Sequence, residues 1–214
     1  MMVTCSEVKE ILREISLIID KKKLYLSELD AAIGDGDHGL NLSKGFKAVE
    51  EIISNTNDND IGNILEMAGM TLVKTVGGAS GPLYGTAFMK GAAVVNNKRN
   101  IDMNDFLNIL IEALNGIKMR GKTVEGEKTI IDTLSPVVDE LKADLGEGRD
   151  LYYIFENLKD VARKGMESTR DIIARKGRAS YLKERSIGHK DPGATSMYYV
   201  LETICEYVLN KKGE

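Results

Sequence analysis

The sequence predicts an all-α protein of about eight helices in one domain. Apolar residues recur with a period of about 3.6 along most of the chain, the pattern of helices that bury one face. No segment shows the sustained alternation of apolar and polar residues that is typical of a strand. The 214 residues contain only 3 prolines, and proline is scarce where long helices dominate.

Six of the predicted helices are marked by apolar stripes that each fit one helical face. The stripes cover residues 8–19, 61–72, 106–117, 130–141, 151–162 and 194–208. Two further helices are predicted from about His38 to Ser54 and from about Gly81 to Asn96. Pro82, Pro136 and Pro192 are each expected near a helix start, where the missing N–H costs little.

The composition predicts a globular protein, with residues 1–214 forming a single domain. The formal net charge is -4 and no basic stripe is present, which argues against a nucleic-acid partner. No apolar run is long enough to span a membrane, and the first residues lack the apolar core of a signal peptide, so we expect a cytoplasmic protein. Cys5 and Cys205 are too few for a disulfide framework or a four-thiolate zinc site.

An acidic loop is the first candidate site. Asp30, Asp35 and Asp37 lie within eight residues of one another, around Gly34 and Gly36. Carboxylates held together repel one another unless a cation compensates, and oxygen ligands of this kind suit Mg²⁺. A plain polar turn with exposed acids is the alternative, and it is the commoner meaning of an isolated Asp-Gly-Asp.

Other metals fit this loop poorly. A calcium loop that began at Asp35 would need glycine where Leu40 stands and glutamate where Phe46 stands. Zinc is disfavoured because the chain has only His38 and His189 and no thiol nearby. The next predicted helix begins directly after the acids, and the free N–H groups of a helix start attract anions. The loop therefore favours a magnesium–phosphate group.

Three further glycine-containing loops leave alternatives open. The stretch 77–82 is either a phosphate cradle or a close contact between two helices. The stretch 121–129 resembles a Walker A loop, but Glu127 separates the second glycine from Lys128, which argues against a P-loop kinase. In the charged stretch 178–193, Asp191 and Pro192 fit a helix start, while Arg178 could instead steer phosphate charge as the loop closes over the nucleotide.

Taken in order, these motifs resemble the nucleotide-binding L subunit family of dihydroxyacetone kinases. The matching segments are 34–39 with Asn41, 78–81, 128–129 and 188–194. The resemblance covers about residues 5 to 210. It implies a closed barrel of eight antiparallel amphipathic helices, with the nucleotide on the loops at one end. Whether the barrel interior would hold a lipid stays open.

The resemblance also implies the site residues. Two Mg²⁺ ions would be held by Asp30, Asp35 and Asp37. ADP or ATP would contact His38, Gly39, Leu40, Asn41, Ser80, Gly81, Gly121, Ile130, Arg178, Asp191, Pro192 and Gly193. Ile130 stands where related chains often carry methionine. No nucleophile is evident, and Arg178 is the candidate phosphate stabiliser.

The implied function is that of a phosphotransferase component. A phosphotransferase-system protein would rephosphorylate bound ADP, and the phosphoryl group would pass to dihydroxyacetone on a separate K subunit. The subunit form is favoured because 214 residues leave no room for a substrate domain. Alternatives are an ATP-using kinase subunit for another small hydroxylated substrate, or a nucleotide-loaded co-regulator of a transcription factor. The fatty-acid kinase group carries threonine where this chain has His38, which counts against it.

Overall fold

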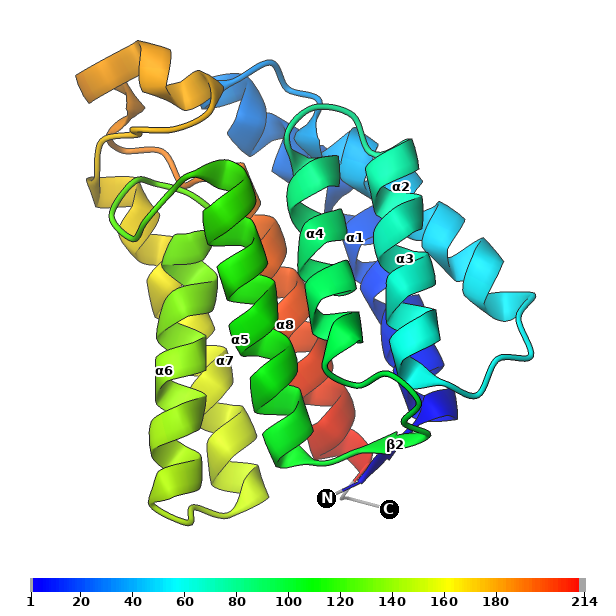
Figure 1. The fold of residues 1–214 in the computed structure, drawn as a ribbon. Coiled ribbons are helices and arrows are strands. Elements are labelled where there is room, and N and C mark those ends of the chain that lie inside the picture. The colour runs from blue at the N-terminus through cyan, green and yellow to red at the C-terminus, as the bar shows by residue number, and fades with distance from the viewer. Residues whose placement is uncertain (1, 212–214) are drawn as a thin grey trace. The chain divides into compact units, whose positions relative to one another are not determined.

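The computed structural model describes residues 2–211, and helices make up most of this range (Figure 1). The α-helices are α1 (Cys5–Ile33), α2 (His38–Ser54), α3 (Ile61–Thr75), α4 (Ser80–Ala93), α5 (Met103–Gly121), α6 (Ile131–Gly146), α7 (Leu151–Ser168) and α8 (Pro192–Lys211). Two 3₁₀ segments, η1 (Thr169–Asp171) and η2 (Arg178–Ser186), lie between α7 and α8. The predicted all-α class is confirmed.

Aspartates begin several of these helices. The Asp60 side chain accepts a hydrogen bond from the Gly62 N–H at the start of α3. Asp102 and Asp105 form a reciprocal capping box at the start of α5. Asp150 accepts from two N–H groups in the first turn of α7. Each carboxylate satisfies a backbone donor that the helix itself cannot, which fixes where the helix begins.

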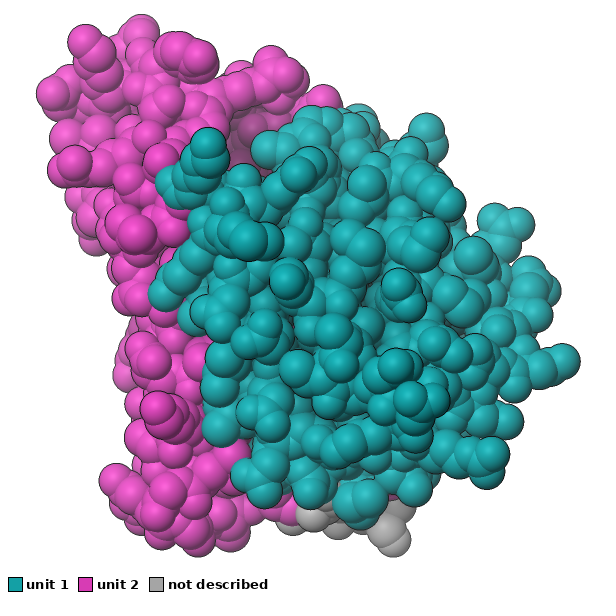
Figure 2. Space-filling view, in the orientation of Figure 1, with its two compact units in different colours: residues 1–20, 40–122 teal, residues 21–39, 123–214 magenta. Residues whose placement is uncertain are grey.

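The chain divides into two compact units, coloured separately in Figure 2. Unit 1 comprises residues 1–20 and 40–122, and unit 2 comprises residues 21–39 and 123–214. The divisions fall inside α1 and near the start of α2. In unit 1, α4 packs against α3 and α5; in unit 2, α6, α7 and α8 pack together. The prediction of one domain over residues 1–214 stays a prediction.

The core of unit 1 depends on close helix contact. A Cβ at Gly69 of α3 would lie 2.7 Å from the carbonyl oxygen of Gly85 of α4, and a Cβ at Gly85 would lie 2.7 Å from the Gly69 oxygen. The two backbones therefore meet where each has no side chain. Nearby, the fully buried rings of Phe46 and Tyr84 meet edge to face with centroids 6.0 Å apart.

Three local features differ from the sequence prediction. Val3–Thr4 (β1) pairs antiparallel with Asn100–Ile101 (β2), and strands of two residues are too short to show alternation. Pro136 lies inside α6, so its expected place near a helix start is wrong. Proline has no N–H, so Pro136 cannot donate the usual helical hydrogen bond to the Asp132 carbonyl. This carbonyl lies against Gly165 of α7, where a Cβ would overlap it. Part of the charged stretch 178–193, predicted to be a loop, is helical, as η2.

No helix in residues 2–211 combines the length and apolar character needed to cross a membrane.

The glycine contact between α3 and α4 can be tested. We expect Gly69→Ala to lower the free energy of unfolding by about 1–3 kcal/mol, because the new methyl would press on the Gly85 carbonyl and on Met89. Gly146→Ala is the matched control, since nothing lies within 4 Å of its Cβ position. That variant should be neutral or more stable by up to about 1 kcal/mol. Urea denaturation measures both, and equal effects would contradict close packing as the reason for Gly69.

Candidate functional site

The acidic loop joins α1 to α2 within unit 2. Asp30 is buried in the last turn of α1, and Asp35 and Asp37 are exposed in the turn that follows. One carboxylate oxygen from each of the three lies within 4.8 Å of the others. The three acids that the sequence grouped by spacing therefore converge in space, as a single metal centre requires.

The position of Asp30 is fixed by the start of α2. Its Oδ2 accepts hydrogen bonds from the Asp37 N–H at 2.9 Å and the His38 N–H at 3.1 Å. A carboxylate at a helix N-terminus is also favoured by the helix dipole. Gly36 turns the chain with a φ of 77°, a conformation that most other residues adopt only at a cost. A Cβ at Gly34 would overlap Asp30 Oδ1, so this glycine leaves the carboxylate its room.

His38 connects the start of α2 to α8. Its Nε2 lies 2.9 Å from Ser196 Oγ, and that hydroxyl donates to the Gly193 carbonyl at 3.0 Å. Burial lowers the pKa of His38 below its usual value, while the nearby carboxylates of Asp30 and Asp37 act in the opposite direction. The imidazole is therefore neutral at pH 7, and it serves as a hydrogen-bonding group rather than a fixed positive charge.

Arg178 reaches the acidic loop from η2. Its Nη2 lies 2.9 Å from Asp35 Oδ2, and both side chains are partly or largely exposed. A small apolar cluster holds this region against the end of α1. Ala174 and Ala179 pack with Ile33, and Leu182 lies on the cluster. The guanidinium therefore lies beside a predicted metal ligand.

The start of α8 agrees with its predicted form. Asp191 Oδ2 accepts from the Ala194 N–H at 2.7 Å, which makes Asp191 the cap and Pro192 the first helical residue. The Asp191 N–H donates to Thr169 Oγ1 at 3.0 Å. Gly193 lies beside Ile130, since its Cβ position would be 3.8 Å from the Ile130 Cβ. Two predicted nucleotide contacts are thus brought together.

Asp191 is also electrostatically unusual. Its pKa is raised to about 7, chiefly by burial. The negative charges of Asp132 and Asp30 also raise this pKa, while the Ala194 N–H and the Lys128 ammonium act in the opposite direction. The carboxyl is therefore half protonated near neutral pH.

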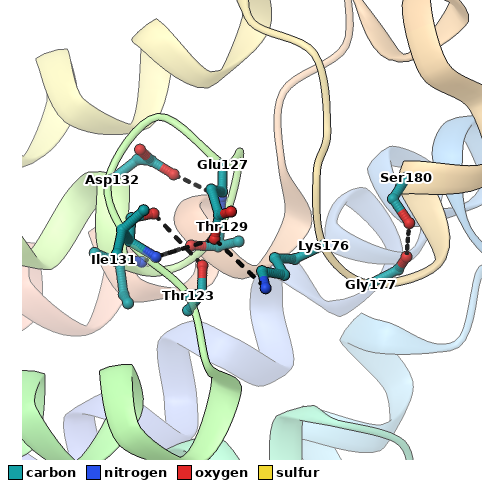
Figure 3. A network of polar contacts seen from close by, with 9 residues as sticks. Thr123, Glu127, Thr129, Ile131, Asp132, Lys176, Gly177 and Ser180 are labelled. Carbon is teal, nitrogen blue, oxygen red and sulfur yellow. Dashed lines mark hydrogen bonds and ion pairs between the residues drawn. The ribbon is translucent and has the colours of Figure 1, made fainter.

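A polar network orders the loop before α6 (Figure 3). The carboxylate of Asp132 accepts from the Gly126 N–H at 2.5 Å and from the Thr129 N–H at 2.7 Å. Glu127 Oε2 accepts from the Val124 N–H at 3.0 Å. The side chain of Glu127 also lies 3.9 Å from Lys176 Nζ. Residues near the start of α6 thereby fix the shape of the loop that leads to Ile130.

Lys128 is a residue that the sequence reasoning left without a role. Its side chain is buried with 1% exposure, and its Nζ donates to the backbone carbonyls of Thr169 (2.5 Å), Ile172 (3.2 Å) and His189. Its φ of 61° costs roughly 1–2 kcal/mol for a residue with a Cβ. Hydrogen bonds from a charged donor contribute about 1.5–3 kcal/mol each, so the contacts outweigh that cost. No local pattern in the sequence marks such a contact.

Apart from Gly39 of unit 2, the remaining predicted contacts belong to unit 1. Leu40, which is exposed, and Asn41, which is half-buried, lie in the first turn of α2. A Cβ at Gly77 would lie 3.1 Å from Asn41 Nδ2, so the loop before α4 touches this side chain. Gly81 packs closely on the Val76 carbonyl, which supports the helix-contact alternative for that loop. The other two, Ser80 and Gly121, are the first residue of α4 and the last of α5.

A family model described as the DAK2 domain matches residues 32–206. The chain belongs to the DAK2 domain family. It is 41% identical over 187 residues to "PEP-dependent dihydroxyacetone kinase, ADP-binding subunit DhaL" of Escherichia coli (strain K12), covering 87% of this chain and 89% of the relative. It is 39% identical over 207 residues to "PTS-dependent dihydroxyacetone kinase, ADP-binding subunit DhaL" of Lactococcus lactis subsp. lactis (strain IL1403), covering 97% and 100%. The resemblance drawn from the motifs is confirmed.

Solved structures share the fold of this DAK2 chain. The native dihydroxyacetone kinase of C. freundii matches with a TM-score of 0.72 and 23% identity, over 94% of this chain and 34% of that one. The same kinase in complex with AMP-PNP and Mg²⁺ matches with a TM-score of 0.69 and 22% identity, over the same shares of the two chains. The present chain therefore spans about a third of the C. freundii kinase.

The raised pKa of Asp191 predicts a pH-dependent effect of Asp191→Asn. Unfolded Asp191 ionises near pH 3.8 and folded Asp191 near 7, so the wild type loses stability as the pH rises through this window. Asparagine keeps an oxygen for the Ala194 N–H and does not titrate. We expect the variant to gain stability relative to wild type between pH 4 and pH 8. Urea denaturation without metal or nucleotide measures this gain.

The matched control is Asp139→Asn, at an exposed acid on the same unit. It should show no such change with pH. A stability difference between Asp191→Asn and wild type that is the same at pH 4 and pH 8 would contradict the assignment.

Proposed function

We propose that this chain is the ADP- and magnesium-binding subunit of a dihydroxyacetone kinase. It would take a phosphoryl group from a phosphotransferase-system protein onto bound ADP and pass it to dihydroxyacetone on a separate K subunit. The observation that carries the proposal is the convergence of Asp30, Asp35 and Asp37 at the start of α2, with Arg178 beside them. The names of the relatives support the same reading.

The three acids fit magnesium by their chemistry and by their placement. Mg²⁺ prefers oxygen ligands and usually combines a few carboxylates with phosphate oxygens and water. Asp35 and Asp37 are exposed to an incoming ion, whereas Asp30 is held by two N–H groups that use only its Oδ2. We propose two Mg²⁺ ions, which would neutralise the negative charge of the phosphates. The C. freundii kinase complex with AMP-PNP and Mg²⁺ supports this pairing of metal and nucleotide.

The protein's own groups would position the nucleotide. N–H groups at the start of α2, over 38–41, would orient phosphate oxygens, together with Ser80 and Gly81. Arg178 would add a fixed positive charge near the phosphates. Gly121, Ile130 and the segment 191–193 would contact the base or ribose. Phosphoryl transfer depends mainly on positioning and charge stabilisation, so no protein nucleophile is required.

The relatives also bear on the phosphoryl donor and the partners. The more similar ones are named PEP- or PTS-dependent subunits, and the chain covers 89% to 100% of the lengths of the two described above. By contrast, L-erythrulose 1-kinase of Mycolicibacterium smegmatis is 32% identical, and the match covers 32% of its length. This difference in the covered share of each relative favours a cytoplasmic phosphotransferase-system donor and a K subunit over direct use of ATP. A transcriptional regulator is a further proposed partner.

The metal assignment is tested with Asp35→Asn. We expect this variant to lose Mg²⁺-dependent ADP binding by about tenfold or more, because a charged ligand is removed while the helices stay intact. Isothermal titration with Mg²⁺ and ADP measures the loss, and circular dichroism checks the helix content. Asp139→Asn should bind as the wild type does.

Loss of the Arg178 ion pair must be separated from loss of a metal ligand. Arg178→Gln removes the pair and keeps all three carboxylates. The Arg178→Gln variant should bind ADP more weakly but still bind Mg²⁺ alone.

Full Mg²⁺-dependent ADP binding by Asp35→Asn would contradict the assignment of Asp35 as a metal ligand.

The donor is tested by native mass spectrometry of the purified protein. A subunit recharged in place needs to keep its nucleotide, so we expect about one ADP per chain to survive buffer exchange in Mg²⁺. Addition of EDTA should release it. A site that exchanges freely with ATP would instead favour a kinase that uses ATP directly.

A further inference from the structure

The segment from Ile172 to His189 controls two groups of the candidate site. It leaves the end of η1, carries Arg178 beside Asp35, and leads directly into Asp191, which caps α8. A shift of this segment would move both groups at once. Small displacements of binding groups strongly weaken binding and catalysis. The contacts that hold this segment in place therefore matter for function.

One ammonium group holds both ends of the segment. Lys128 Nζ donates to the carbonyl of Ile172 at one end and to that of His189 at the other. Its third contact is the Thr169 carbonyl, just before the segment begins. An ammonium has three protons, so these contacts use its full donor capacity. Lys128 therefore closes the base of the segment 172–189.

We propose that Lys128 is a positioning residue, whose buried ammonium holds the base of segment 172–189 closed and thereby sets Arg178 and Asp191 for the nucleotide. The nucleotide part of this inference rests on the proposed function, whereas the fastening of the segment does not. Lys128 would act through the main chain, without touching the nucleotide itself.

The contact needs a charged group at this position. Charge-assisted hydrogen bonds are roughly twice as strong as neutral ones. Thr169 and Ile172 lie where α7 and η1 end, and carbonyl groups at helix ends favour a cation. Burial lowers the pKa of Lys128, while the nearby charges of Asp191, Asp171 and Asp132 act in the opposite direction and favour the ammonium. An apolar side chain of similar size would leave these three carbonyl groups without the ammonium donor, and the contact with Thr169 is buried.

Other contacts preserve the internal shape of the segment. The Ser186 hydroxyl accepts from the Ala174 N–H at 2.9 Å and donates to the Lys183 carbonyl at 2.6 Å. The apolar cluster around Ile33 also remains. At the base itself, the Gly188 N–H donates to the Arg170 carbonyl at 2.8 Å, and this neutral hydrogen bond is left when Lys128 is removed. Loss of Lys128 should therefore loosen the base of the segment without unfolding the protein.

The test compares Lys128→Met with Lys122→Met. Lys122 is exposed and also has a left-handed backbone, with φ 47°, so it controls for loss of a lysine from this conformation. We expect Lys128→Met to raise the rate of tryptic cleavage within 172–189 about tenfold or more. ADP affinity in Mg²⁺ should fall by a similar factor, while binding of Mg²⁺ alone stays unchanged. Lys122→Met should match the wild type in all three measurements.

Lys128→Arg provides the rescue, because arginine stays charged and donates hydrogen bonds. It should restore most of the protection and the ADP affinity. If Lys128→Met loses helix content, Lys128→Gln replaces it, with a neutral amide that can still donate.

The outcomes separate the fastening from the function. If Lys128→Met is cleaved at the wild-type rate, Lys128 does not hold the base of the segment closed. The same conclusion follows if Lys128→Arg is cleaved as fast as Lys128→Met. Faster cleavage with unchanged ADP affinity would overturn the positioning role. If the wild type binds no ADP, the proposed function fails, while faster cleavage of Lys128→Met would still support the fastening.

Discussion

Mutual repulsion among three carboxylates is the constraint around which the candidate site is built. Asp30, Asp35 and Asp37 place oxygens within 4.8 Å of one another. Two unit charges at about 4 Å repel by about 1 kcal/mol in water and about 4 kcal/mol near a protein surface. The dipole at a helix start offsets about 0.3–1 kcal/mol of this repulsion. An exposed ion pair such as that of Arg178 with Asp35 offsets about the same amount. These protein groups are too weak to balance three charges, so a divalent cation is the compensation that the geometry favours.

Other polar groups of unit 2 lie close to this concentration of negative charge. The acids are placed by a glycine turn and by N–H groups at the start of α2, rather than by a cationic cage. His38 is kept neutral by burial and connects α2 to α8 through Ser196. Burial is the main reason why the pKa of Asp191 is raised, and the nearby charges of Asp132 and Asp30 add to the effect. The acidic loop therefore has three carboxylates close together, with Arg178 paired to one of them.

Much of this arrangement could be predicted from local sequence patterns. The apolar stripes located the helices, and α2 begins at His38 and ends at Ser54 as expected. The acidic loop and the cap at Asp191 were also found, because each depends on neighbours in the sequence. Pro136 was misplaced because its tolerance inside α6 depends on a contact with Gly165 of α7. Lys128 was missed for the same kind of reason, since its acceptors lie 41 to 61 residues away along the chain.

The stretch 121–129 shows why spacing and geometry must be judged together. A Walker lysine reaches the phosphates of a nucleotide. Here the comparable residue, Lys128, donates three hydrogen bonds to main-chain carbonyls, and its side chain is only 1% exposed. Its charge is thus unavailable to a phosphate, as the displaced position of the lysine had suggested. In the proposed function, the phosphate charge would instead be met by metal ions on the acidic loop, by helix N–H groups and by Arg178. The buried lysine contributes indirectly, by holding the segment from which that arginine extends.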